Sequence, residues 1–157
     1  MQICEMSDKE SLFLLSSLTE LGYCSKRMIY ERVKPVNEIF EMDFDTLKTS
    51  LKLSEKQIRA VLSLKLKTDE LHEEYLSLSD RKIRFILPFE DDYPQKLLNI
   101  SDYPFGIFVK GDVPQNKKSV AIVGSRSASE YGLGMARFIA RELAQSGVDI
   151  ISGMALG

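Results

Sequence analysis

The sequence predicts an α/β protein in two parts: a small all-α module over residues 1–78, then the first part of a parallel sheet over residues 79–157. Capping signals and apolar residues spaced three or four apart dominate the first part. Short β-branched runs, small-residue turns and one long helical pattern characterise the second. The chain of 157 residues suffices for one ordinary domain and a small addition.

The amino-terminal module is expected to consist of short helices. A capping box and leucines spaced about three apart predict the first helix over 8–21. The second follows Ser25 and is stopped by Pro35. Another capping box, Ser54–Gln57, opens a long helix whose apolar stripe continues to Leu78. The module serves either packing and protein contact or auxiliary DNA contact.

Four strands are expected in the second part: 82–87, 105–110, 119–123 and 148–151. The run 119–123 is apolar and β-branched, which is typical of a strand buried on both faces of a parallel sheet. A helix then begins near Ala128, behind the capping box of Ser127 and Glu130, and ends at Gly147. The strand 148–151 returns parallel to 119–123 by a right-handed crossover, and the two earlier strands are expected to extend this sheet.

Two turns after neighbouring parallel strands form the candidate site, because the carboxyl edge of an open α/β sheet is where ligands bind. A glycine there admits close approach, a serine offers a hydroxyl, and an arginine can grip a phosphate with two hydrogen bonds. The following helix adds N–H groups and the positive end of its dipole. The predicted phosphate-binding residues, including two lysines that add positive field, are Gly124, Ser125, Arg126, Ser152, Gly153, Lys117 and Lys118.

Charge and glycine content around this site leave alternatives open. The net charge of −2 argues against indiscriminate coating of nucleic acid. Within 115–142, five basic side chains face two acidic ones, which is either a binding patch or an ordinary solvated face. Gly132 and Gly134 in the first helical turns cost about 1 kcal/mol each relative to alanine. Bound nucleic acid or the packed sheet is expected close to them.

Nucleotide cofactors are not expected. Arg137 stands where a dinucleotide fingerprint needs its third glycine, and Asp149 lies at the beginning of its strand, the wrong end for a ribose hydroxyl. The sequence also has no GxxxxGK[ST] loop. NAD and ATP are therefore excluded as expected ligands.

Catalytic and metal sites are not expected either. His72 is the one histidine, and Leu76 occupies the place of the second histidine of a zinc-protease motif. No nucleophile–base pair can be assembled, so we expect no enzymatic activity. Cys4 and Cys24 match no metal or redox spacing and are interpreted as free thiols in a reducing cytoplasm. No apolar run is long enough for a membrane span, and the acidic amino terminus does not fit a signal peptide.

Several segments resemble the DNA-processing protein A (DprA/Smf) family in order and spacing. They are V-A-I-V-G-S-R at 120–126 and S-G-M-A-L-G at 152–157, preceded by D-Y-P-Q-K-L at 92–97 and P-F-G-I-F-V-K-G at 104–111. The resemblance covers residues 80–157 and the helical part only loosely. It implies an extended Rossmann-like fold that binds single-stranded DNA and a non-enzymatic mediator that loads RecA in natural transformation. The first turn would then hold a DNA phosphate.

The resemblance also implies what this chain should lack. It stops at Gly157, whereas family members continue, so we expect a truncated form of the DNA-binding domain. Further basic DNA contacts, the surface of a homodimer and the RecA contact belong to the later part of relatives. Leu156 stands where many relatives have a basic residue, which weakens the grip of this loop.

Two other functions stay open at this level. The rival is a nucleotide-binding Rossmann-like enzyme of the phosphoribohydrolase type, which would show a PGGxGT stretch and a catalytic glutamate. This chain has neither, although a longer chain could carry them. The other alternative is a fragment that binds no DNA and whose helical module contacts another protein.

Overall fold

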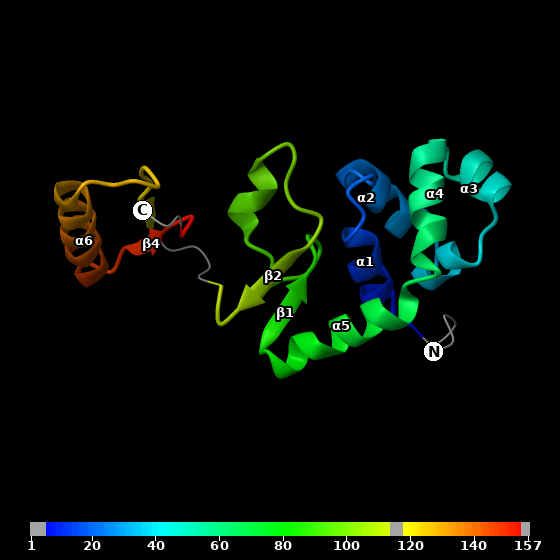
Figure 1. The fold of residues 1–157 in the computed structure, drawn as a ribbon, viewed down its shortest axis with the longest axis horizontal. Coiled ribbons are helices and arrows are strands. Elements are labelled where there is room, and N and C mark those ends of the chain that lie inside the picture. Colours follow the sequence, from blue (N-terminus) through cyan, green and yellow to red (C-terminus); the bar gives the residue numbers. More distant parts are fainter. Residues whose placement is uncertain (1–5, 114–117, 155–157) are drawn as a thin grey trace. The chain divides into compact units, whose positions relative to one another are not determined.

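The computed structural model describes residues 6–113 and 118–154. The chain forms two compact units, Met1–Val113 and Pro114–Gly157 (Figure 1). The first unit combines helices with a two-stranded sheet, and the second has one strand–helix–strand element. No helix within the described ranges is both long and apolar enough to cross a membrane.

The first unit begins with a group of short helices. They are α1 (Asp8–Ser16), α2 (Tyr23–Arg32), the short 3₁₀ helix η2 (Val36–Phe40), α3 (Phe44–Ser50), α4 (Glu55–Leu64) and α5 (Thr68–Asp80). The expected all-α module is therefore present, with α1 in contact with α2, η2 and α5. The Ser54 capping box is confirmed at the start of α4, where both reciprocal hydrogen bonds form.

Two helices are shorter than the sequence predicts. α1 ends at Ser16 and not near residue 21, and the hydroxyls of Ser16 and Ser17 donate to the carbonyls of Phe13 and Leu14, each at 2.6 Å. The long helix expected from residue 54 to residue 78 is interrupted after Leu64, where the next three N–H groups bond to carbonyls three residues back. The break leaves Leu66 91% exposed.

A β-hairpin packs on these helices. β1 (Ile83–Ile86) pairs antiparallel with β2 (Ile107–Lys110), and the short 3₁₀ helix η3 (Gln95–Asn99) lies between them in the chain. Phe85 and Phe105 belong to the same hydrophobic cluster as the leucines of α1. Gly106 fits tightly there, since a Cβ at this position would lie 2.4 Å from the Phe85 ring.

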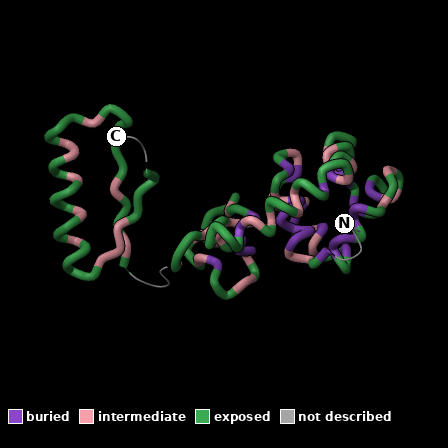
Figure 2. The backbone as a smooth tube through the Cα atoms, turned by 60° about the horizontal axis from the view of Figure 1, so that its bottom comes forward, coloured by how far each residue is buried: buried purple, intermediate pink, exposed green. Residues whose placement is uncertain are grey.

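Residues 1–113 form one compact unit, and the helices and the hairpin of this unit share one hydrophobic cluster. α1 contributes four consecutive buried side chains to this core: Leu12, Phe13, Leu14 and Leu15. Figure 2 shows the buried positions gathered in this unit.

The second unit is the predicted strand–helix–strand element. β3 (Ser119–Ala121) and β4 (Asp149–Ile151) pair in parallel, and α6 (Glu130–Gln145) connects them. Gly147 has φ +75°, which suits a residue that ends a helix and turns the chain back. The start of α6 corrects the prediction: Ser129, not Ser127, is the cap and accepts from the Gly132 N–H at 3.2 Å.

The expected single sheet of four strands is not formed among the described residues, since β1 and β2 pair with each other and β3 and β4 form a separate sheet. β3 is consequently not buried on both faces, and Val120 is 39% exposed. Within 118–154 no residue is buried, which Figure 2 shows as a tube without the buried colour. The apolar face of α6, including Met135 and Ile139, is likewise exposed.

Candidate nucleic-acid interface

An open cavity of about 810 Å³ lies in the second unit, at the carboxyl ends of β3 and β4 and the first turns of α6. Its walls combine small polar residues with a few aliphatic ones. They are Ile122, Val123, Gly124, Ser125, Ser127, Ala128, Ser129, Gly132, Leu133, Ala136, Ser152 and Gly153. Four of the predicted site residues thus lie on one cavity.

Strand pairing explains why two turns 27 residues apart meet. Ala121 is in register with Ile151, and the Ile122 N–H continues the ladder by donating to the Ile151 carbonyl at 2.9 Å. The residues that follow each strand therefore leave the sheet side by side. This is the edge at which open α/β sheets bind ligands.

Each turn holds a serine in the same way. The Ser127 N–H donates to Ser125 Oγ at 3.1 Å, and the Met154 N–H donates to Ser152 Oγ at 3.1 Å. A serine hydroxyl that accepts a hydrogen bond can still donate its own proton. The backbone therefore fixes the orientation of both serine side chains. Their O–H groups can still donate hydrogen bonds to an anionic ligand.

The amino terminus of α6 contributes to the same cavity. Its N-cap Ser129 and the first-turn residue Gly132 both line it. The first N–H groups of an α-helix have no intrahelical acceptor and carry partial positive charge, which favours an anion. Glu130 in the first turn opposes this, because its exposed carboxylate competes for the same positive end.

The glycines near the cavity are not needed for internal packing. A Cβ at Gly124, Gly134 or Gly153 would meet no atom within 4 Å, and one at Gly132 would meet only Ser129 Oγ, at 3.4 Å. The sequence left two explanations for Gly134, a packed sheet or bound nucleic acid close to the helix. The sheet does not pack against Gly134 in the structure. The space in front of the Gly124 turn is open to a ligand.

The predicted basic residues that the structure describes, unlike the predicted glycines and serines, are not among the residues that line the cavity. Arg126 is exposed in the loop between Ser125 and Ser127, although it is not among the residues that line the cavity. Lys118 lies at the other end of β3, where its carbonyl accepts from the Asp149 N–H, so the structure does not bring it to the loops. Lys117 and Leu156 lie outside the described residues.

Sequence reasoning missed Ser127 and Ser129 as wall residues of the cavity and took the first of them only for a helix cap. The signal was present in the run S-R-S-A-S, in which either serine can precede a helix. The aliphatic wall from Ile122 and Leu133 was also missed. Ile122 belongs to the run that the pattern assigned to a buried strand, and Leu133 belongs to the predicted helix.

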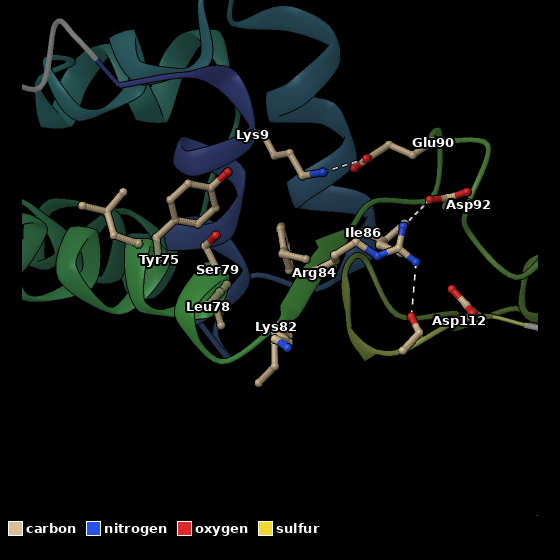
Figure 3. Close-up of a pocket in the computed structure, with 14 residues that line it drawn as sticks. Lys9, Tyr75, Leu78, Ser79, Lys82, Arg84, Ile86, Glu90, Asp92 and Asp112 are labelled. Carbon is tan, nitrogen blue, oxygen red and sulfur yellow. Dashed lines mark hydrogen bonds and ion pairs between the residues drawn. The ribbon is translucent and has the colours of Figure 1, made fainter.

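A second cavity, of about 610 Å³, lies in the first unit between α5, β1 and the turn after it (Figure 3). Lys9 pairs there with Glu90 at 2.7 Å, and the Arg84 guanidinium pairs with Asp92 and reaches the Gly111 carbonyl at 3.4 Å. The acidic turn thus pairs with these cations. Three carboxylates, of Glu90, Asp92 and Asp112, line this cavity, so it is the weaker candidate for a polyanion.

Known proteins match part of the chain. The family model of DNA recombination-mediator protein A matches residues 84–157. Protein Smf of Borreliella burgdorferi is 39% identical over 93 residues, covering 59% of this chain and 29% of that protein. Protein Smf of Escherichia coli is 39% identical over 74 residues, covering 46% of this chain and 20% of that protein.

DNA processing protein DprA of Bacillus subtilis is 36% identical over 67 residues, covering 41% of this chain and 23% of that protein. The matched part of the chain spans 20–29% of the length of these three relatives. No solved structure matches the chain. The matched segment contains both serine turns, α6 and the cavity between them. The carboxyl-terminal part of the chain, residues 84–157, thus matches the family of DNA recombination-mediator protein A, and the similar proteins carry the names Smf and DprA.

Proposed function

We propose that this chain binds single-stranded DNA in the cavity at the ends of β3 and β4, as the DNA-contacting part of a recombination mediator. One observation carries the proposal: two serine-containing turns and a helix amino terminus border the same open cavity. Hydroxyl donors and helix N–H groups suit phosphate oxygens, and the cavity holds no acidic side chain among its wall residues in the described part of the chain.

The proposed roles follow from position. Ser125 and Ser152 donate their hydroxyl protons to phosphate oxygens, while Gly124 and Gly153 let the strand approach the backbone. Arg126, exposed on the rim, closes over a phosphate from outside the cavity. The aliphatic part of the wall accommodates sugar and base edges.

A salt titration of oligonucleotide binding tests the proposal. Each phosphate contact to a single strand contributes about −0.7 to the slope of log affinity against log salt. Arg126→Ala should therefore make the slope shallower by about 0.7 and weaken binding to all sequences alike. Arg141→Ala is the matched control, because it removes the same charge from an exposed site far along α6. An Arg126→Ala slope equal to that of the parent chain would contradict the proposal.

The wider function is part of the same proposal. By the resemblance to the DprA/Smf family, the bound strand is delivered to RecA during natural transformation, in the cytoplasm and without catalysis by this chain. The test is whether the chain speeds RecA assembly on DNA coated with single-strand-binding protein. Hydrolysis of nucleoside monophosphates by the purified chain would instead favour the phosphoribohydrolase alternative.

A further inference from the structure

One face of α2 alternates aromatic and basic side chains. Tyr23, Arg27, Tyr30 and Lys34 are spaced by four, three and four residues, which places them in one row, with Lys34 just beyond the end of the helix. The Lys34 ammonium lies 3.5 Å from the centroid of the Tyr30 ring, which shows that the row continues past the helix. Such alternation of rings and cations is typical of surfaces that bind single-stranded nucleic acid.

A second set of rings packs directly against this row and lines a small cavity with it. Phe89 stacks on Tyr30 with ring centroids 4.1 Å apart and planes 6° from parallel. Tyr103 lies against Tyr23 at 4.3 Å, and their hydroxyls form a hydrogen bond. The cavity has a volume of about 280 Å³ and is lined by these four rings together with Phe105, Arg27, Glu31, Pro88 and Leu98.

We propose that this cavity takes one nucleobase of a single-stranded DNA, with Arg27 and Lys34 on the adjoining phosphates, an inference that rests on the proposed function. Its volume is at the small end of ligand pockets, which suits one ring system and not a folded ligand. Phe89 remains 48% exposed, so ring surface is available for stacking. Stacking on aromatic side chains tolerates any base, as a recombination mediator requires.

The charges around the cavity favour an anionic partner. The exposed charges of residues 23–34 are Arg27, Arg32 and Lys34 against Glu31, a local excess of positive charge in a chain whose net charge is −2. Arg27 pairs with Glu31 at 2.7 Å and Lys34 with Asp8 at 3.4 Å, all four groups being at least two-fifths exposed. Exposed pairs of this kind are weak, so a phosphate can compete for both cations. A proline-rich peptide, the alternative ligand for an aromatic surface, would pack on the rings but would not pair with the cations.

The test uses the whole 157-residue chain and an oligothymidylate that carries one 2-aminopurine. Stacking in the cavity quenches the fluorescence of this base. Phe89→Leu keeps the apolar volume and removes the aromatic face, so we expect quenching to be lost and affinity to fall by about five- to a hundredfold. Phe89→Tyr keeps the ring and should bind like the parent chain.

Charge variants and an abasic strand complete the design. Arg27→Ala should weaken binding more than Arg32→Ala, because Arg32 is on the same helix but does not line the cavity. Arg27→Ala also keeps the test valid if Phe89→Leu disturbs folding, since Arg27 is exposed. With an oligonucleotide that is abasic at every position, Phe89→Leu should no longer differ from the parent.

The outcomes separate this inference from the proposed function. If Arg126→Ala weakens binding while Phe89→Leu and Arg27→Ala do not, the base pocket is wrong and the phosphate site stands. If only the α2 cavity variants weaken binding, the base pocket is supported and the phosphate site is wrong. If no oligonucleotide binds at low salt, both are overturned. Protection of this cavity by a proline-rich peptide, without 2-aminopurine quenching, would also overturn the base pocket.

Discussion

Glu10 of α1 and His72 of α5 form a hydrogen bond, with Nδ1 of the histidine 2.5 Å from Oε1 of the glutamate. Glu10 is 7% exposed, so its carboxyl group is almost removed from water. The one histidine of the chain thus links two helices of the first unit.

Removal of His72 should destabilise the first unit. His72→Ala leaves the Glu10 carboxyl buried without this partner, which costs about 1–3 kcal/mol of unfolding free energy. Urea unfolding followed by far-ultraviolet circular dichroism measures the loss. In a double-mutant cycle, Glu10→Ala combined with His72→Ala should cost less than the sum of the single changes, because the second change removes no further pair. An additive cycle would show that the two side chains are not coupled.

The two serines before α6 should differ in their effect on its stability. Ser129→Ala removes the acceptor of the Gly132 N–H and should cost about 1 kcal/mol, whereas Ser127→Ala removes no cap. Hydrogen exchange of the Gly132 amide is the direct measurement. Faster exchange in Ser127→Ala and not in Ser129→Ala would mean that the cap is the one that the sequence pattern indicated.

Local signals in the sequence were sufficient for much of the fold. Ser54 with Gln57, Gly147 and the strand–helix–strand order around α6 act within a few residues, so their effect can be read from spacing alone. The start of α6 was predicted wrongly, because Ser127 has the capping-box spacing to Glu130 whereas the actual cap, Ser129, has Gly132 at that position. Only the hydrogen bond to Gly132 distinguishes them.

Long-range pairing could not be obtained from spacing. Nothing near Phe85 in sequence shows that its ring packs on Gly106 and joins the helical core, yet this packing ties β1 and β2 to the helices. The candidate site was predicted better, because the meeting of Ser125 and Ser152 follows from parallel pairing. Lys118 was misplaced since a strand carries the chain about 3.3 Å per residue away from its start.

Alkaline pH should destabilise the first unit through Tyr23. Burial, and next the hydrogen bond with Tyr103, raise the pKa of Tyr23 from its usual value of 10.0 to about 12. The unfolded chain then loses this proton before the folded one. Stability from this group is complete below pH 10 and falls as pH rises toward 12.

Phenolate absorbance and unfolding midpoints across this range measure both effects. Tyr23→Phe should remove the last phenol to titrate and flatten the alkaline fall in stability. Burial also raises the pKa of Tyr75 and Tyr93, so part of the fall should persist in this variant. A titration curve unchanged by Tyr23→Phe at its upper end would contradict the assignment.

Glu130 should lower the affinity of the candidate site for DNA. Its carboxylate is exposed in the first turn of α6, the end of the helix that would attract a phosphate. Glu130→Gln keeps the size of the side chain and removes the negative charge, so oligonucleotide affinity should rise by a few-fold at low salt, and the gain should shrink as salt screens it. Glu142→Gln, near the other end of α6, is the matched control and should give no such gain. An equal rise in affinity in both variants would mean that the net charge of the chain, and not the charge at the amino terminus of α6, determines the affinity.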